Sequence, residues 1–562
     1  MFFQIFKIFF FIFLLIYQGP LYSKKKNINE FNSKDLSNYF SAQVSYSNQK
    51  NIDALRFFNS SKSLLKKHDP YLKRYTFSLI LEEKVSLAIK EIKLSNNKNN
   101  SNFFESYLLL IIDSIINNDF DKAKKYLVNL SKFKTRNNLN YFIYESLEDF
   151  IFLFKENKIP QKDRRFAKLS SINKAFHHCY LSKKESENFF LSLFTAGEFD
   201  YSRYIFFYIT ELVKKNKIDE AKKFANKIDI LSSNLLVIQS KNWIDSGKIE
   251  KFNEIFSCKK ESNILSEFFF LISNLYSSQN DYENSNFYLN ISNYLNSKFK
   301  FNLTLLSENY FNIEDYEKSK KVLNNFNKKD QVYYWYKVKT NTKILTEQKG
   351  KEDSYRYISS EFDKFDDPSE KVLFDIANIS KSFKKYRVAI KYYDKLLSTV
   401  NLNSKIHAEI LFRRGSCYER LEEFEKSDED LLKSLKINPE DAYVLNYLAY
   451  SWLERNYKMN ESMEMLEKAH KIKKNDPFIL DSVGWAYYLI GDTIKAEQFL
   501  KAAIKIMPDD PVINDHYGDV LWELNRRIQA KYYWQNVLNF EDTEEDMKKK
   551  INVKLIKGLN KI

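Results

Sequence analysis

Two segments of the chain align with each other without a gap, and this internal repetition limits the possible folds more than any other feature. They read AEILFRRGSCYERLEEFEKSDEDLLKSLKINP (residues 408–439) and PFILDSVGWAYYLIGDTIKAEQFLKAAIKIMP (residues 477–508). Both have glycine at the eighth place, an aromatic residue three places later and proline at the thirty-second: Gly415 and Gly484, Tyr418 and Tyr487, Pro439 and Pro508. A period of this length indicates an array of small, similar units.

Further copies flank these two segments. A stretch that starts at Pro511 repeats the register with Gly518, Leu521, Ala530 and Trp534, and a copy with one inserted residue contains Ala449, Trp452 and Ala469. Towards the N-terminus only a small residue of the second half recurs, 34 or 35 residues apart in most pairs: Ala54, Ala88, Ala123, Ala221, Ser285, Ser319, Ser354 and Ala389. Residues 131–208 are too diverged to phase, and by length they hold roughly two or three more helical pairs.

The repeated pattern predicts pairs of antiparallel helices. Small residues at the eighth and twentieth places let two helices approach closely, while large apolar residues fill the space between neighbouring pairs. Proline ends the second helix because it cannot continue the helical hydrogen bonds. The whole chain of 562 residues has only 9 Gly and 8 Pro, which leaves little material for hairpins or glycine-rich phosphate loops. An all-α chain is therefore expected.

This pattern resembles the tetratricopeptide repeat (TPR) family, whose unit is a helix–turn–helix of about 34 residues. The resemblance implies an all-α TPR α-solenoid, a right-handed superhelix of antiparallel helix pairs. The expected organisation is a signal peptide or anchor at 1–23, a linker at 24–36, divergent helical repeats at 37–260, divergent TPR-like repeats at 261–403, regular repeats at 404–540 and a capping helix at 541–562. The cap is predicted because Met547, Ile551, Leu555 and Leu559 form one apolar stripe at four-residue spacing.

The first residues, MFFQIFKIFFFIFLLIYQGPLYSKKK, read as an export signal. Lys7 precedes an apolar run from Ile8 to Tyr17, which Gly19 and Pro20 end. The run has the length of a signal-peptide core and falls short of the ~20 residues that span a bilayer. Leu21 and the lysines after Ser23 fit cleavage poorly, so an uncleaved anchor remains the alternative. Either reading predicts a location in the periplasm or on the periplasmic face of the cell envelope.

Few residues are candidates for chemistry. The three cysteines, Cys179, Cys258 and Cys417, form no metal-binding spacing and allow at most one disulfide, so small buried residues are the favoured reading. His177 and His178 beside Cys179 point about 100° apart on a helix and need further ligands to hold a metal. No Walker loop, nucleophile elbow or zinc-protease motif occurs, which predicts no enzyme activity, no cofactor and no metal. A hydrolase hidden in residues 131–208 is the remote alternative.

The net charge of +15 does not indicate a nucleic-acid partner. Lysines alternate with Glu and Asp along the expected helix faces, and neither an Arg-rich block nor an RNA-binding signature accompanies them.

In the TPR family, the first helices of successive pairs line a concave groove, and certain places of each repeat face it. Carried over to this chain, the resemblance implies a groove for a peptide or protein with apolar anchors and a basic group. The alternative is that some of the groove residues pack on the capping helix or on the next repeat. The residues are Tyr443, Asn446, Tyr450, Phe478, Asp481, Trp485, Tyr488, Asp515, Asp519 and Trp522. The sixth places hold Arg413, Tyr447, Ser482 and His516 rather than the Asn of carboxylate-clamping relatives, so a clamp for a C-terminal carboxylate is not expected.

Residues 404–540 also resemble the C-terminal repeats of large exported TPR proteins of Gram-negative bacteria. Some of these are lipoprotein adaptors that hold a periplasmic processing protease beside its substrates, but this chain lacks a lipidation cysteine near the cleavage point. The function expected is a non-enzymatic scaffold of the cell envelope. A structural subunit of an envelope-biogenesis or polysaccharide-export assembly is the second hypothesis.

Overall fold

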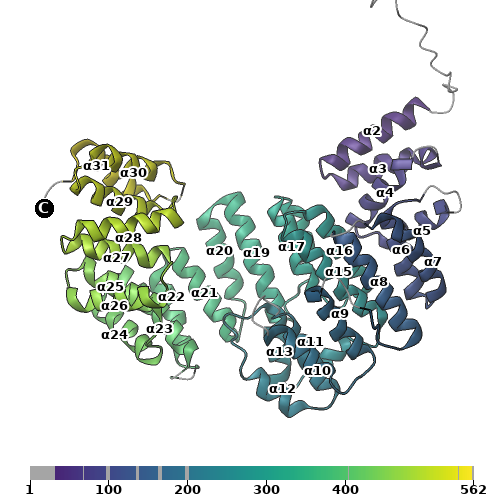
Figure 1. Cartoon of the computed structure of the whole chain (residues 1–562), viewed down its shortest axis with the longest axis horizontal. Coiled ribbons are helices and arrows are strands. Elements are labelled where there is room, and N and C mark those ends of the chain that lie inside the picture. Colours follow the sequence, from purple (N-terminus) through teal and green to yellow (C-terminus); the bar gives the residue numbers. More distant parts are fainter. Residues whose placement is uncertain are drawn as a thin grey trace, which may run out of the picture. The chain divides into compact units, whose positions relative to one another are not determined.

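A computed structural model describes residues 32–66, 69–96, 101–134, 138–162, 167–195, 202–400, 402, 404–541 and 543–559. In these ranges the chain forms helices and no β-strand (Figure 1). The helices of the N-terminal half are α2 (Ser33–Ser47), α3 (Asn51–Ser60), α4 (Asp69–Leu81), α5 (Val85–Asn96), α6 (Phe104–Ile116), α7 (Phe120–Leu130), α8 (Leu139–Glu156), α9 (Ala167–Tyr180), α10 (Ser186–Thr195), α11 (Tyr204–Lys214), α12 (Ile218–Ala225), α13 (Leu235–Asp245), α14 (Glu250–Ile255), α15 (Glu261–Ser277) and α16 (Tyr282–Leu295), with two short 3₁₀ turns, Lys62–Lys66 and Ser131–Phe133.

The C-terminal half continues in the same manner. Its helices are α17 (Asn302–Asn312), α18 (Tyr316–Leu323), α19 (Gln331–Lys349), α20 (Lys351–Phe362), α21 (Glu370–Ser382), α22 (Tyr386–Leu397), α23 (Lys405–Arg420), α24 (Phe424–Ile437), α25 (Ala442–Glu454), α26 (Met459–Ile472), α27 (Pro477–Leu489), α28 (Thr493–Ile506), α29 (Pro511–Glu523), α30 (Arg527–Asn539) and α31 (Glu545–Lys557). Two compact units divide these helices, one of residues 1–228 with 233–337 and one of residues 229–232 with 338–562.

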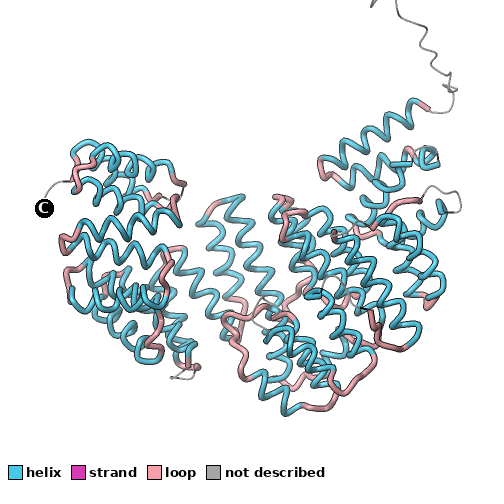
Figure 2. Tube along the Cα trace, in the orientation of Figure 1, coloured by secondary structure: helices cyan, strands magenta, loops and turns pink. Residues whose placement is uncertain are grey.

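Many helices pack as a pair with their neighbour in sequence, for example α15 with α16 and α27 with α28, and short loops join them (Figure 2). The expected all-α TPR solenoid is confirmed. The diverged residues 131–208 hold α8, α9, α10 and the start of α11. The export signal predicted at residues 1–23 lies outside the described residues. Within the described ranges, no helix is long and apolar enough to cross a membrane.

The turn inside most pairs contains one residue with a left-handed backbone. Only Gly populates this conformation without a steric penalty, and Asn is the next best tolerated. This glycine-poor chain uses Gly at three of these turns, Gly247, Gly350 and Gly491. The others hold residues with a side chain: Gln49, Glu83, Asn118, Ser182, Asn216, Asn280, Glu314, Lys384, Glu422, Asn456 and Asn525. The low glycine content therefore predicted helices correctly but hid the regularity of the turns.

Small residues lie where the helices of a pair cross, as the repeat pattern predicted. All eight tracked positions of the second helices, from Ala54 to Ala389, are fully buried. A Cβ atom on Gly484 would come within 2.7 Å of Leu500 Cγ, and one on Gly518 within 2.5 Å of the Trp534 ring. Only a residue without a side chain fits these two crossings.

Candidate functional site

The predicted groove residues lie on the first helices of three successive pairs, α25, α27 and α29. Each helix is preceded by an aspartate, Asp441, Asp476 or Asp510, whose carboxylate accepts hydrogen bonds from two backbone N–H groups of the first turn. In α27 and α29 proline follows this cap, at a position that needs no N–H donor. The equal starts place equivalent residues of the three helices in the same register.

The first turns of these helices expose apolar side chains at equivalent places. Tyr443 is 46% exposed and Phe478 is 49% exposed. The ring of Tyr443 lies under the ammonium group of Lys473, 4.4 Å from its centroid, and its hydroxyl donates a hydrogen bond to Asp476. Both rings are thus at the surface, as a binding role requires. Asn446, farther along α25, is half-buried.

The middle of the site is a group of stacked rings, which we call the aromatic surface: Tyr450, Trp485, Tyr488 and His516. Trp485 stacks on the His516 ring at 4.0 Å and on Tyr488 at 4.8 Å between centroids. Tyr450 lies 6.4 Å from His516 on the neighbouring helix. Trp485 donates its indole N–H to Glu454, at 2.8 Å, so a carboxylate borders the rings. Tyr450, Trp485 and Tyr488 remain partly exposed.

Asp481 is placed differently from the expectation of a groove-facing carboxylate. It is 6% exposed, and its two oxygens lie 3.0 and 3.1 Å from Nδ1 of His516. Burial disfavours the charged imidazole, but Asp481, with Asp515 and Asp519 nearby, more than offsets this and raises the pKa of His516. Asp481 therefore orients a ring of the aromatic surface. His516 therefore has its hydrogen-bond partner on α27, the first helix of the preceding repeat.

Asp515, Asp519 and Trp522 are covered by the C-terminal helix α31. Lys554 Nζ lies 2.5 Å from Asp515 Oδ1 and 2.7 Å from Asp519 Oδ1. Asp519 also accepts the indole N–H of Trp534 at 2.9 Å and is 5% exposed. Burial and the charge of Asp515 raise the pKa of Asp519 to about 6, although Lys554 and His516 oppose the shift. Of the two readings left open for these residues, packing on the cap describes this structure.

The divergent repeats provide a recess that the sequence pattern did not reveal. A cavity of about 370 Å³ opens between α19 and α21, lined among others by Lys339, Lys343, Asp375 and Asn378. Lys339 Nζ lies 2.6 Å from Asp375 Oδ2. The repeat of α19 lacks the glycine and proline signals of the regular repeats, so its groove-facing positions could not be assigned from sequence.

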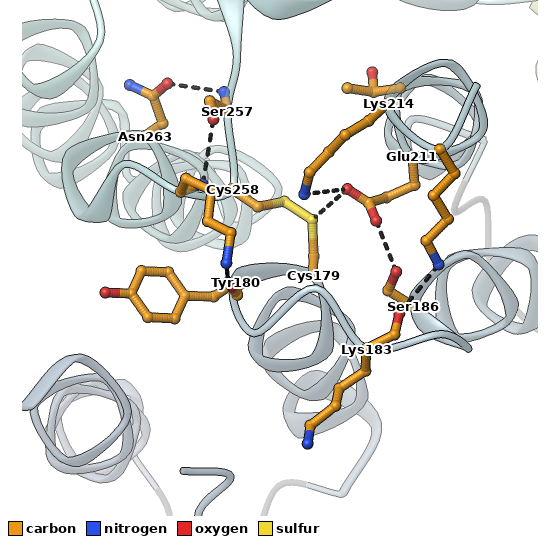
Figure 3. Close-up of a disulfide and its surroundings, with 12 residues drawn as sticks. Cys179, Tyr180, Lys183, Ser186, Glu211, Lys214, Ser257, Cys258 and Asn263 are labelled. Atoms are coloured by element: carbon orange, nitrogen blue, oxygen red, sulfur yellow. Dashed lines mark hydrogen bonds and ion pairs between the residues drawn. A yellow bond between two sulfur atoms is a disulfide. The ribbon is translucent and has the colours of Figure 1, made fainter. Parts of the chain in front are cut away.

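The favoured reading of the cysteines as merely small buried residues is wrong for two of the three. Cys179, at the end of α9, forms a disulfide with Cys258, which follows α14, and their Cα atoms are 5.8 Å apart (Figure 3). Glu211 of α11 lies against the bridge and binds Ser186 and Lys214. Cys417 is a buried free thiol. Sequence alone could not choose the pair, because the partners are 79 residues apart and share no motif.

The residues around Cys179 do not assemble the histidine-containing metal site that was considered. His177 packs edge-on against Phe150, whereas His178 stacks on Phe189 at 3.8 Å between centroids. The sulfur atoms of Cys179 and Cys258 and a carboxylate oxygen of Glu211 all lie within 4.8 Å of one another. Both sulfurs are bonded to each other, however, so neither is a thiolate ligand in this state.

The regular repeats also match a known family. A tetratricopeptide repeat family model matches residues 408–441, which hold the α23–α24 pair. The chain therefore contains a tetratricopeptide repeat. No curated protein sequence matches this TPR chain.

Solved structures of TPR proteins resemble parts of the chain. They include MamA (41-end) from Desulfovibrio magneticus RS-1, with 16% identity over 31% of this chain and 97% of that one and a TM-score of 0.26. A thermophilic TPR protein from Thermus thermophilus, TTC0263, has 17% identity over 34% of this chain and 100% of that one, with a TM-score of 0.30. A TPR protein from Parabacteroides merdae ATCC 43184 has 14% identity over 51% of this chain and 98% of that one, with a TM-score of 0.33. TPR proteins in general are scaffolds for protein–protein interaction.

Proposed function

We propose that this TPR protein is a non-enzymatic scaffold of the bacterial cell envelope, which binds a protein partner through the first helices of its C-terminal repeats. The observation that carries the proposal is the aromatic surface, where Tyr450, Trp485 and Tyr488 remain partly exposed on consecutive repeats. Large, rigid rings supply much of the binding energy at protein interfaces. The exposed carboxylates of Glu454 and Glu523, at the ends of α25 and α29, favour a partner with basic side chains.

Two features support the envelope location. The N-terminal residues have the pattern of an export signal. The Cys179–Cys258 disulfide fits an oxidising compartment such as the periplasm, because cytosolic thiols are kept reduced. Adaptor contact with a periplasmic protease or an envelope assembly component is the partner class that this location favours.

The partner experiment compares two double variants of the full chain. Tyr443→Ala with Phe478→Ala removes exposed rings beside the aromatic surface without touching the core. Ile494→Ala with Ile528→Ala serves as the control, because it removes two exposed apolar side chains from second helices; these residues are 67% and 88% exposed. Crosslinking in intact cells should lose partner species only with the first variant. Equal partner sets for the wild type and the first variant would contradict binding at this surface.

The location is tested separately, by alkylating thiols in cells before lysis. Cys179 and Cys258 should be protected from alkylation until a reductant is added, and the protein should fractionate with the envelope. Free Cys179 and Cys258 thiols in a cytosolic fraction would contradict the envelope location, whatever the partner experiment shows.

The second candidate function is a structural subunit of an envelope-biogenesis assembly. The observation in its favour is that exposed apolar residues also occur on second helices and turns, where Ile490, Ile494, Ile528 and Tyr532 are each more than half exposed. Apolar groups of this size on a monomer often mark contacts with other proteins. Loss of a stoichiometric complex in the Ile494→Ala, Ile528→Ala variant alone would favour this candidate over the first.

A further inference from the structure

The helix α31 occupies part of the surface that the first helices of the repeats would otherwise present to a partner. It packs on α30, and Figure 1 shows these two helices beside α29 at the C-terminal end of the chain. Ile551 is fully buried, and Met547, Leu555 and Leu559 pack on the same apolar cluster as Trp534. These four residues form the apolar stripe of the amphipathic helix.

The contacts of α31 combine charge and shape in the way that a bound peptide does. Lys554 places its ammonium between two carboxylates, Asp515 and Asp519, of α29. One turn farther on, Gly558 has a φ of +72°, and a Cβ atom there would lie 2.1 Å from the Trp522 ring. The backbone of α31 thus comes into direct contact with an aromatic side chain of the groove. Two adjacent buried carboxylates repel each other unless a cation lies between them.

The surface continues beyond the area covered by α31. Tyr488 lies close enough to Asp515, Asp519 and Glu523 that their charges, after burial itself, raise the pKa of its hydroxyl. Tyr488 stacks on Trp485, which in turn stacks on His516. An acidic, aromatic surface therefore extends from the footprint of α31 across α27, and α31 covers only its C-terminal end.

The interactions of α31 leave it open to replacement. Val553 and Ile556 are 49% and 82% exposed, so the outer face of the helix is open to solvent. The ion pair of Glu544 with Lys384 joins two side chains that are 68% and 65% exposed, and such surface pairs contribute only about 0–1 kcal/mol. A competitor with the same apolar stripe and a lysine at the same place can reproduce the apolar packing and the ion pairs of α31 with Asp515 and Asp519.

We propose that α31 is an intramolecular occupant of the partner site, and that a basic amphipathic helix of the partner displaces it by placing a Lys or Arg between Asp515 and Asp519. This inference rests on the proposed binding function. It identifies the partner segment and the way in which the site is closed when no partner is present. The short tether to α30 gives α31 a high effective concentration at the site. The observed affinity for a partner is therefore the intrinsic affinity multiplied by the fraction of molecules in which α31 is released.

The test uses the full chain and a fluorescent peptide with the sequence of residues 543–559 as the probe. Lys554→Gln and Gly558→Ala each loosen α31. Lys549→Gln is the matched control, because Lys549 is 77% exposed and forms an ion pair with Asp546 of its own helix. Hydrogen exchange at Glu545–Lys557 should become faster in the two loosened variants and stay unchanged in the control. Fluorescence anisotropy should show the peptide binding about tenfold more tightly to the loosened variants than to the wild type.

Peptide chemistry provides the second arm. A probe peptide that carries Lys554→Gln should bind the loosened protein at least about tenfold more weakly, the effect of losing one buried charged contact. Asp515→Asn in the loosened protein should likewise weaken the binding of the unmodified peptide.

Three results would overturn the proposal. If the loosened variants do not bind the peptide, α31 is a permanent cap. If the loosened variants lose exchange protection throughout α27–α30, α31 is an integral part of the fold. Exchange of α31 between copies, seen as a concentration-dependent dimer of the wild type, makes a second copy the occupant. In each case the crosslinking comparison of Tyr443 and Phe478 still decides the proposed function independently.

Discussion

The two units of the molecule build the same kind of helix pair with different packing. In the first unit, one continuous core joins residues from Tyr39 to Phe299 and is rich in Phe and Tyr rings, of which Phe206 and Phe207 are almost fully buried. In the second unit, the crossings of the regular repeats are so close that glycine is required, as at Gly484 and Gly518. At some helix crossings of the first unit, two serines take the place of glycine. Ser307 and Ser319 are an example, with 3.0 Å between their hydroxyl oxygens.

This difference bears on why the repeat pattern is easy to recognise in the C-terminal repeats and hard to recognise in the first unit. Glycine at a crossing cannot be replaced without moving a helix, so the regular repeats keep a recognisable pattern. A core of large rings tolerates many hydrophobic combinations as long as the total volume is conserved. The same solenoid can therefore persist in the first unit after most of its sequence pattern has been lost.

The comparison predicts that the largest single losses of stability come from the aromatic core of the first unit. Phe207 contacts the rings of Phe176, Phe190 and Phe256, so Phe207→Ala leaves a cavity among residues that cannot close it. The free energy of unfolding of the first unit should fall by about 3–5 kcal/mol. Denaturant titration combined with hydrogen exchange assigns the loss to the first unit. Phe40→Ala, at a ring that is 62% exposed, should have little effect.

Loss of the disulfide should be the next largest effect. Cys179→Ala with Cys258→Ala releases a loop closed over 79 residues and should destabilise the first unit by about 2–4 kcal/mol. A reductant should lower the melting temperature of the wild type but leave that of the double variant unchanged. Cys417→Ala, in the second unit, should show the same response to reductant as the wild type. A wild-type melting curve that ignores the reductant would show that the bridge contributes nothing to stability.

In the second unit, a single added methyl group should be harmful at a close crossing. Gly518→Ala forces Cβ into the ring of Trp534, which is fully buried and bonded to Asp519, and should cost about 1–3 kcal/mol. Gly415→Ala is the graded control, since the nearest side-chain atoms to its added Cβ lie farther away, at 3.1 Å, so a smaller loss of stability is expected. Equal melting temperatures for both variants would break the argument that close crossings preserve the repeat pattern.

Local patterns in the sequence predicted the fold because they report helix crossings and stops directly. The buried small residues from Ala54 to Ala389, and the ends of α24 and α28 just before Pro439 and Pro508, follow from the repeat alone. The same reasoning placed Tyr443 and Phe478 on the exposed face of their helices. It could not decide what covers Asp519. That outcome depends on where α31 packs, and an apolar stripe states only that the helix packs somewhere.

Contacts between distant segments were beyond reach for the same reason. The pairing of Cys179 with Cys258 depends on how three diverged helices pack, and no spacing encodes it. The location of Asp481 under His516 depends on the close approach of α27 and α29, which are 35 residues apart at this contact. A residue's place in the repeat thus predicts its helix face, whereas its partner follows only from the neighbouring helices.

The smallest expected effect is on the pH dependence of stability. It comes from the cluster of His516 and Asp519 in the second unit. The folded-state pKa of His516 is raised by Asp481, and that of Asp519 is raised to about 6 chiefly by burial. Both groups bind a proton more tightly in the folded state than in the unfolded state. The stability that they contribute is therefore present at low pH and is lost as pH rises through their folded pKa values.

His407, in the same unit, acts in the opposite direction, because burial lowers its pKa. The pH dependence of the wild type alone therefore does not isolate the cluster, but a comparison with His516→Gln does. The pH is raised from about 5.5 to about 8, a range that brackets the ordinary pKa of histidine. As the pH rises, hydrogen exchange in α29, corrected for the intrinsic exchange rate, should accelerate more in the wild type than in His516→Gln. Identical pH profiles of the two proteins would show that the ion pair of the His516 imidazolium with Asp481 does not stabilise α29.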